Sequence, residues 1–95
     1  MRIRLSPKAK ADLADIWDYS KEEWGEDRAG RYLDGLGDRM IWLAAHTSLW
    51  KPRDDLAEEL FSYPQESHVI YFREVAGAIE IVRILHQRMD VAQRL

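Results

Sequence analysis

Residues 67–86 read SHVIYFREVAGAIEIVRILH, and this stretch decides the fold. Side chains alternate between two faces through residues 67–75 and again through residues 78–86, which is the two-residue period of a β-strand. Ala76 and Gly77 separate the two runs and supply a turn. The stretch therefore predicts two neighbouring antiparallel strands.

Both faces of this predicted hairpin carry apolar side chains. On its first strand Ile70 and Phe72 alternate with Val69 and Tyr71. A sheet that is apolar on both faces needs cover on both sides. One face is expected to lie under helices, whereas the second is closed either by the chain's own loop and C-terminal tail or by another protein. An uncovered apolar groove is typical of a partner site.

The chain upstream of the hairpin adds a third strand. Leu60, Phe61 and Tyr63 form a short apolar run that we expect Pro64 to end, and the polar pair at residues 65–66 makes a turn. Together these segments predict a three-stranded antiparallel meander. The preceding residues 46–57, which include Trp50, are rich in turn-forming residues and predict a loop.

A helix is predicted to begin at Ser6 and Pro7, because serine is a good N-cap and proline suits the first helical position. Its apolar stripe consists of Ala9, Leu13, Ile16, Trp17, Ser20 and Trp24. The acidic side chains are expected elsewhere on the helix, at Asp12, Asp15, Asp18 and Glu22. Gly25 supplies the left-handed stop of this helix.

A second helix is predicted to begin at residues 26–27, where acidic side chains favour a helix N-terminus. Its apolar stripe consists of Ala29, Tyr32, Leu33, Leu36, Met40, Leu43 and Ala44. So short a link makes the two helices an antiparallel hairpin. Gly30 and Gly37 project to the edge of this stripe, and close approach of the first helix is the simplest reason for them. Trp42 projects away from it, either packed under the next loop or exposed as a binding anchor.

Ile3 and Leu5 alternate with Arg2 and Arg4 and predict a short first strand. The fold class is therefore α+β: a short N-terminal strand, an antiparallel two-helix hairpin, and a three-stranded antiparallel meander with the helices packed on one face. The length of 95 residues fits one domain, residues 1–95.

Composition excludes several classes of protein. The absence of cysteine rules out disulfides, thiolate metal sites and a cysteine nucleophile, and it fits a reducing cytoplasm. No apolar run approaches the roughly 20 residues of a membrane span. The three histidines, His46, His68 and His86, lack metal-ligand spacing, and no glycine-rich phosphate loop is present. We therefore expect no metal, cofactor or membrane partner, and a cytoplasmic location.

The net charge of -3 is unevenly distributed. Residues 1–11 carry four basic side chains and no acidic one, whereas residues 12–38 carry nine acidic side chains against three basic ones. The last thirteen residues are basic again. A sustained basic stripe with interleaved aromatic residues, as in a dedicated nucleic-acid binder, is absent.

Short motifs occur in a fixed order along essentially the whole chain: Leu5-Ser6-Pro7, Ala11-Asp12-Leu13 with Ile16 and Tyr19, Trp24-Gly25 before Ala29 and Tyr32, His68-Val69-Ile70-Tyr71-Phe72-Arg73, and Arg83-Ile84-Leu85-His86 before Met89-Asp90. In this order and spacing the sequence resembles the RelE/ParE superfamily of bacterial toxins, and more closely its ParE branch. The resemblance implies a non-enzymatic toxin of a type II toxin–antitoxin system that poisons DNA gyrase.

The resemblance also implies the partners. These are DNA gyrase and a ParD-like antitoxin of the ribbon–helix–helix type, through which alone the toxin meets operator DNA. We expect the antitoxin on the apolar groove, with interface candidates Trp42, Trp50, Phe61, Tyr63 and Tyr71. Candidates for target contact are Arg83, His86, Arg88 and Arg94, although the segment 86–90 also has a simpler role in ending the last strand. The resemblance transfers no catalytic residue.

Two alternatives remain open. RelE-like relatives cleave messenger RNA on the ribosome, which needs proton carriers and cations around the phosphate. Lys51, Arg53, Arg83 and Arg88 are candidate phosphate contacts, and Tyr71, His68 or His86 candidate proton carriers. His68 and Tyr71 lie three residues apart on a strand and face opposite sides unless a bulge intervenes, while Phe61 stands where such relatives would place an arginine. The second alternative is a non-toxic relative that only binds the antitoxin.

Overall fold

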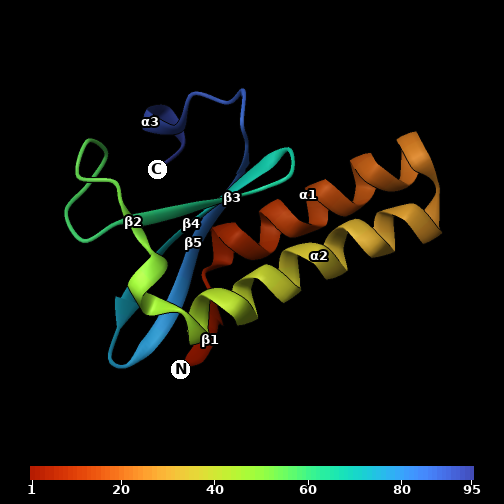
Figure 1. The fold of residues 1–95 in the computed structure, drawn as a ribbon. Coiled ribbons are helices and arrows are strands. Elements are labelled where there is room, and N and C mark those ends of the chain that lie inside the picture. The colour runs from red at the N-terminus through yellow and green to blue at the C-terminus, as the bar shows by residue number, and fades with distance from the viewer.

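The computed structural model describes residues 1–95, and its elements follow one another as strand, helical hairpin and sheet (Figure 1). The elements are β1 (Arg2–Leu5), α1 (Pro7–Trp24), α2 (Glu26–Ala45), a 3₁₀ turn η1 (Thr47–Leu49), β2 (Lys51–Pro52), β3 (Phe61–Gln65), β4 (His68–Val75), β5 (Ala78–His86) and α3 (Val91–Arg94). The strands form one sheet in the order β1-β5-β4-β3-β2. The predicted α+β fold is confirmed, and β2 and α3 are additions that the sequence pattern did not indicate.

Strand pairing follows the predicted meander. β3 pairs antiparallel with β4, and β4 pairs antiparallel with β5, whereas β1 joins the free edge of β5 in parallel orientation. The predicted end of β3 at Pro64 is wrong, since the strand continues to Gln65. Pro64 pairs with Val69 of β4, while β2 reaches β3 only at Phe61 and Ser62. The other edge of β3 is therefore open at Pro64, where a residue without an N–H group is tolerated.

The helical hairpin is built as predicted at its ends. The Ser6 hydroxyl accepts a hydrogen bond from the Ala9 N–H at 3.0 Å and donates one to the Val82 carbonyl at 2.8 Å, so it ties the start of α1 to β5. Gly25 between the helices has a φ of 89°, a left-handed conformation that favours glycine. The turn that reverses the chain after Trp24 therefore depends on this residue.

The predicted close approach of the helices at Gly30 and Gly37 is wrong. A Cβ atom at either position would have no heavy atom of another segment within 4 Å. The fully buried small residue in the first turns of α2 is instead Ala29. Packing thus gives no reason for these two glycines. A Cβ at Gly35 would lie 3.4 Å from the Gln65 Nε2 atom, so the tip of β3 comes close to α2 there.

The main core lies between the helical hairpin and one face of the sheet (Figure 1). Its fully buried large side chains are Leu36 and Leu43 from α2 and Ile70, Phe72, Ile79 and Ile81 from the sheet. Each buried side chain of this size contributes about 1.5–3 kcal/mol through removal from water. This core fixes the hairpin across the sheet and so positions the ends of β4 and β5 beside α1.

The second face of the sheet carries a smaller cluster, centred on Leu60, Tyr71 and Leu85. Leu56 from the loop and Val91 from α3 pack against this cluster. Tyr71 is only 5% exposed as a result. Of the two alternatives for this face, closure by the chain's own loop and C-terminal tail is the one observed at its centre, and the apolar groove expected there for the antitoxin is not left open.

Candidate partner-binding site

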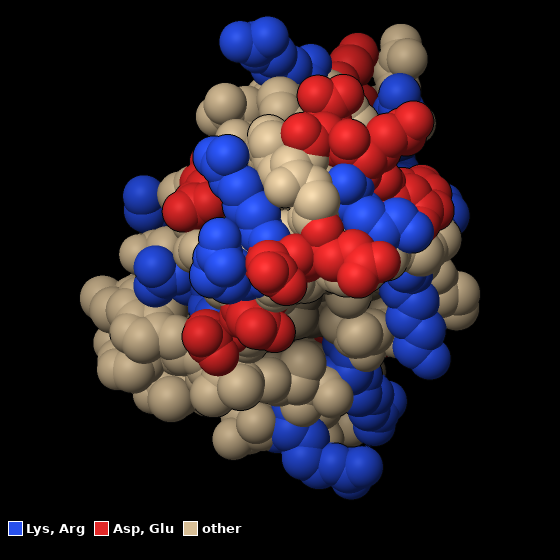
Figure 2. Space-filling model, turned by 90° about the vertical axis from the view of Figure 1, so that its right-hand side faces the viewer, with Lys and Arg blue, Asp and Glu red and all other residues tan.

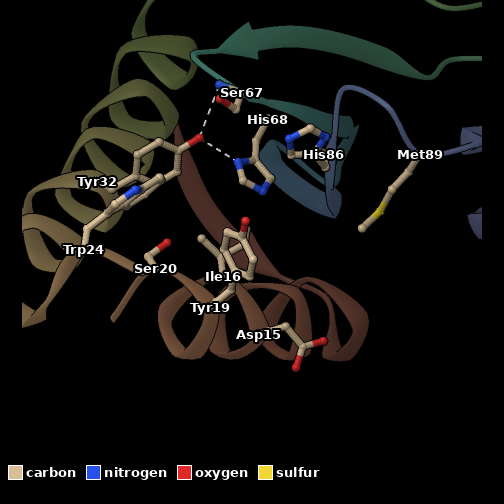
Figure 3. Close-up of a pocket in the computed structure, with 10 residues that line it drawn as sticks. All are labelled: Asp15, Ile16, Tyr19, Ser20, Trp24, Tyr32, Ser67, His68, His86 and Met89. Atoms are coloured by element: carbon tan, nitrogen blue, oxygen red, sulfur yellow. Dashed lines mark hydrogen bonds between the residues drawn. The ribbon is translucent and has the colours of Figure 1, made fainter. Parts of the chain in front are cut away.

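A cavity of about 360 Å³ opens between the helical hairpin and one end of the sheet, where β4 begins at His68 and β5 ends at His86. We call it the aromatic–histidine groove, and Figure 3 shows the side chains that line it. Those from the hairpin are Asp15, Ile16, Tyr19, Ser20, Trp24 and Tyr32, and those from the sheet end are Ser67, His68, His86 and Met89. The apolar side of α1 therefore contributes both to the groove and to the main core, since Ile16 belongs to both.

Hydrogen bonds fix one wall of the groove. The Tyr32 hydroxyl lies 2.6 Å from His68 Nδ1 and accepts a hydrogen bond from the Ser67 N–H at 3.3 Å (Figure 3). Burial, and next the charge of His86, lowers the pKa of His68. Neutral His68 can therefore accept the hydroxyl hydrogen of Tyr32, whose pKa is raised by its own burial. The wall is a neutral, pre-formed network.

Large apolar side chains at the mouth of the groove remain exposed. Tyr19 is 63%, Trp24 41% and Met89 43% exposed, although Trp24 contacts both Tyr19 and Tyr32 edge-on or tilted. Exposed apolar side chains gathered at a concave site indicate an interface, and tryptophan and tyrosine are enriched among binding hot spots. The groove suits an apolar segment of a partner protein.

A buried ion pair lies beside the groove and was missed by the sequence reasoning. Asp12 was expected on an outer face of α1, but it is 8% exposed. Its carboxylate accepts hydrogen bonds from Arg83 Nε at 2.8 Å, Arg83 Nη2 at 2.7 Å and the Ile84 N–H at 2.9 Å. The Ile84 N–H lies past the last β1–β5 pair, Leu5 with Ile81. Asp12 thus replaces the missing neighbour strand at this edge of β5.

A β-bulge brings Arg83 into that pairing. Tyr71 pairs with Arg83 and Phe72 with Ile81, so Val82 is an extra residue in β5. A bulge re-aims the side chains that follow it, and Arg83 donates to Asp12 of α1 and to the Arg94 carbonyl of α3. In the sequence, the only indication of this pairing is that Arg83 interrupts the apolar run of the last strand.

Three of the four candidates for target contact, Arg83, His86 and Arg94, line one small hollow of about 100 Å³, and the Arg88 N–H donates to His86 Nδ1 at 3.1 Å. Arg83 is paired with Asp12, and its side chain is 14% exposed. His86 lies in the groove beside His68, with ring centroids 5.4 Å apart. Arg88 and Arg94 are exposed on the tail after β5. Only these last two arginines therefore present their charge freely to a partner.

The five candidates for the antitoxin interface divide between the two faces of the sheet. Trp42, Trp50, Phe61 and Tyr63 pack against the main core on the helix-covered face, whereas Tyr71 lies in the cluster on the second face. Trp50 is fixed there by its Nε1 atom, which donates to the Leu43 carbonyl at 2.8 Å. Trp42 stacks on His46 with ring centroids 4.6 Å apart. These residues therefore do not line one common groove.

The groups considered for RNA cleavage fall into two places: the Arg53 guanidinium carbon lies 5.9 Å from the Tyr71 ring centroid, and Arg83 lines one small hollow with His68 and His86. Tyr71 belongs to the second face, while His68 lines the groove on the helix side, as their strand spacing predicts. Arg53 pairs with Asp55 at 3.0 Å and Arg83 with Asp12 at 2.7 Å, which neutralises two of the four cations. The two candidate cations that lie beside a candidate proton carrier, Arg53 and Arg83, are therefore already paired with carboxylates.

Charges on the surface are mixed. In Figure 2, which views the molecule from the right-hand side of Figure 1, acidic side chains gather in the centre and upper part of the face and basic side chains lie around them. No group of three or more histidine, cysteine or carboxylate side chains could hold a metal ion. None of the helices combines the length and the apolar composition that a membrane-spanning helix requires.

Comparison with known proteins shows which family the chain matches. Residues 3–91 match the family model described as ParE toxin of type II toxin–antitoxin system, parDE. The chain is 38% identical over 92 residues to Toxin ParE1 of Caulobacter vibrioides, covering 97% of this chain and 95% of that protein. It is 37% identical over 95 residues to Toxin ParE1 of Mycobacterium tuberculosis H37Rv, covering 99% and 97% of the two chains.

A solved structure described as the chromosomal ParDE TA system from P. aeruginosa has the same fold. Its TM-score is 0.79 at 22% identity, over 90% of this chain and 95% of that one. The family match covers almost the whole chain and so includes both the groove and the Asp12–Arg83 pair. The chain belongs to the ParE toxin family of type II toxin–antitoxin systems.

Proposed function

We propose that this toxin inhibits growth by poisoning DNA gyrase, acting in the cytoplasm through binding rather than catalysis, and that a cognate ParD-like antitoxin neutralises it by direct contact. The observation that carries the proposal is the match to the ParE family over residues 3–91. The pairing of Arg53 with Asp55 and of Arg83 with Asp12 supports the non-catalytic part, because phosphoryl chemistry needs positive charge at the reacting phosphate.

The aromatic–histidine groove is the surface that best suits the antitoxin. It is concave and mainly apolar, and it keeps Tyr19 and Trp24 exposed in the free chain. A segment that is disordered alone can order on such a surface by burying its own apolar side chains there. The exposed arginines Arg88 and Arg94 follow β5 near the same end of the sheet and are the remaining candidates for contact with gyrase.

The test uses purified toxin, gyrase and supercoiled plasmid. We expect double-strand breaks to accumulate and to become visible as linear DNA after detergent and protease treatment. No breaks together with cleavage of messenger RNA on translating ribosomes would replace the proposal by a RelE-like activity. Absence of both effects, with normal growth on expression of the toxin alone, would leave a protein that only binds antitoxin.

A further inference from the structure

A second hollow lies along α2, separate from the aromatic–histidine groove. It has a volume of about 330 Å³ and is lined by Gly35, Asp38, Arg39 and Trp42 from α2 and by Gln65 from the end of β3. It shares no lining residue with the groove. We call it the Arg39 site.

Arg39 is held in one orientation by its neighbours. Its guanidinium carbon lies 4.8 Å from the ring centroid of Trp42 and 5.1 Å from that of Tyr63. Its Nε atom donates to Gln65 Oε1 at 2.9 Å. Stacking on aromatic rings and a fixed Nε together hold the planar guanidinium before any ligand arrives. Little side-chain freedom is then left to lose on binding.

The outer edge of this guanidinium has no partner in the chain. Arg39 takes part in none of the ion pairs of the protein, and its one side-chain hydrogen bond is made by Nε. The η nitrogens therefore remain available, and two parallel N–H groups of arginine match the two oxygens of a carboxylate or phosphate. The site therefore presents an oriented guanidinium edge without a partner in the chain.

The surroundings favour one carboxylate over a nucleic-acid backbone. The fold brings together basic and aromatic side chains that are far apart in the sequence. Lys51 and Arg39 both lie over the Tyr63 ring, and Arg39 also lies over the Trp42 ring. However, both Arg39 and His46 already lie over the Trp42 ring, and the Asp38 carboxylate lines the same hollow. Stacked bases would find the Trp42 ring already covered by Arg39 and His46. The Asp38 carboxylate repels any anion, so a single carboxylate held by the two η N–H groups of Arg39 fits the hollow better than a run of phosphates.

We propose that the Arg39 site binds an aspartate or glutamate side chain of a protein partner, and that the antitoxin supplies it; the second part rests on the proposed function. Tryptophan, tyrosine and arginine are the residue types that dominate binding energy at protein interfaces, and this site combines all three. Gly35 in the same hollow faces the Gln65 amide that holds Arg39, since a Cβ at Gly35 would lie 3.4 Å from Gln65 Nε2.

The test measures antitoxin affinity of full-length toxin by calorimetry. We expect Arg39→Met to weaken binding at least tenfold, and Arg39→Lys to weaken it less because it keeps the charge but loses the two-pronged contact. The matched control is Arg4→Met on β1, an exposed arginine that lines none of these cavities, and it should change affinity less than twofold. Thermal unfolding of each variant checks that the fold is retained.

Replacing each acidic residue of the antitoxin in turn by its amide identifies the ligand. One replacement should reproduce the loss seen with Arg39→Met and add nothing in that background. Unchanged affinity of both Arg39 variants would overturn the inference alone, whereas no binding by the unaltered toxin would overturn it together with the proposed antitoxin. Loss of gyrase poisoning or of DNA binding by Arg39→Met, with antitoxin affinity intact, would assign the site to another partner.

Discussion

Asp12 is the residue that the sequence pattern placed on the wrong side of its helix. An acidic side chain between apolar positions is normally assigned to solvent, because burial of a lone carboxylate is costly. Here its cost is offset by Arg83 and by the Ile84 N–H, which come from residues 71 and 72 positions away. The residue pattern of α1 alone cannot predict a hydrogen-bond partner so distant in the sequence. By contrast, the burial of Ile16 and Leu36 followed directly from helical spacing.

Removing one member of this pair should be strongly destabilising. We expect Asp12→Ala to lower the free energy of unfolding by about 3 kcal/mol, because it leaves Arg83 and a backbone N–H without their acceptor. Urea denaturation measures this loss. Asp18→Ala, at an exposed position of the same helix, is the control and should change it by less than about 0.5 kcal/mol. The pair is merely a surface contact if both variants behave alike.

His68 should make the stability of the protein fall in mild acid. Its pKa is lowered in the folded chain, by burial and by His86, so the unfolded chain binds a proton more readily. Stability is therefore full above the ordinary histidine pKa near 6.5 and decreases as the pH falls below it. The urea midpoint at pH 7 and pH 5 measures the effect, which should shrink in His68→Gln and persist in His46→Gln. An equal fall in the His68 variant would contradict the assignment.

Trp24 should contribute to antitoxin binding far more than to folding. It is exposed at the mouth of the groove, so Trp24→Ala removes contact area for a partner without opening the main core. We expect antitoxin affinity to fall at least tenfold, in line with a hot-spot loss of about 2 kcal/mol. The control Ile41→Ala alters an exposed apolar residue of α2 outside the groove. Equal affinities of the two variants would remove the groove from the interface.

At the scale of elements, the length of a helix or strand decides whether its residue pattern could predict it. α1, α2, β4 and β5 are each long enough to show a period, whereas β2 has two residues and α3 four. The bulge at Val82 was also beyond pattern reading, since it depends on the pairing of β4 with β5. The groove depends on such long-range placement as well, and this is why its histidines were not grouped in advance.

The cover of the second face should depend on α3. Val91 packs against the cluster of Leu60, Tyr71 and Leu85 although it lies in a four-residue helix. Val91→Asp should lower the free energy of unfolding by about 1–2 kcal/mol through lost apolar burial. The neighbouring exposed position provides the control, Ala92→Asp, with almost no effect expected. Equal chemical denaturation curves would show that the tail does not cover this face.

At the scale of the whole molecule, the charge polarity of the sequence does not become one basic surface. The two basic chain ends lie at opposite ends of β5, because β1 pairs with its first residues and α3 follows its last (Figure 1). Arg83 is neutralised by Asp12 within the fold. The molecule therefore has an apolar groove and mixed surface charges (Figure 2), and its two basic chain ends do not join into one basic surface.

The most direct measurement combines both proposed partners in one reaction. Gyrase, supercoiled plasmid and toxin are mixed, and the antitoxin is then titrated while linear DNA is quantified. We predict that breaks form with toxin alone and disappear as the antitoxin reaches the concentration of toxin. Gyrase that continues to supercoil without trapped breaks, at toxin concentrations that arrest growth in cells, would contradict the account.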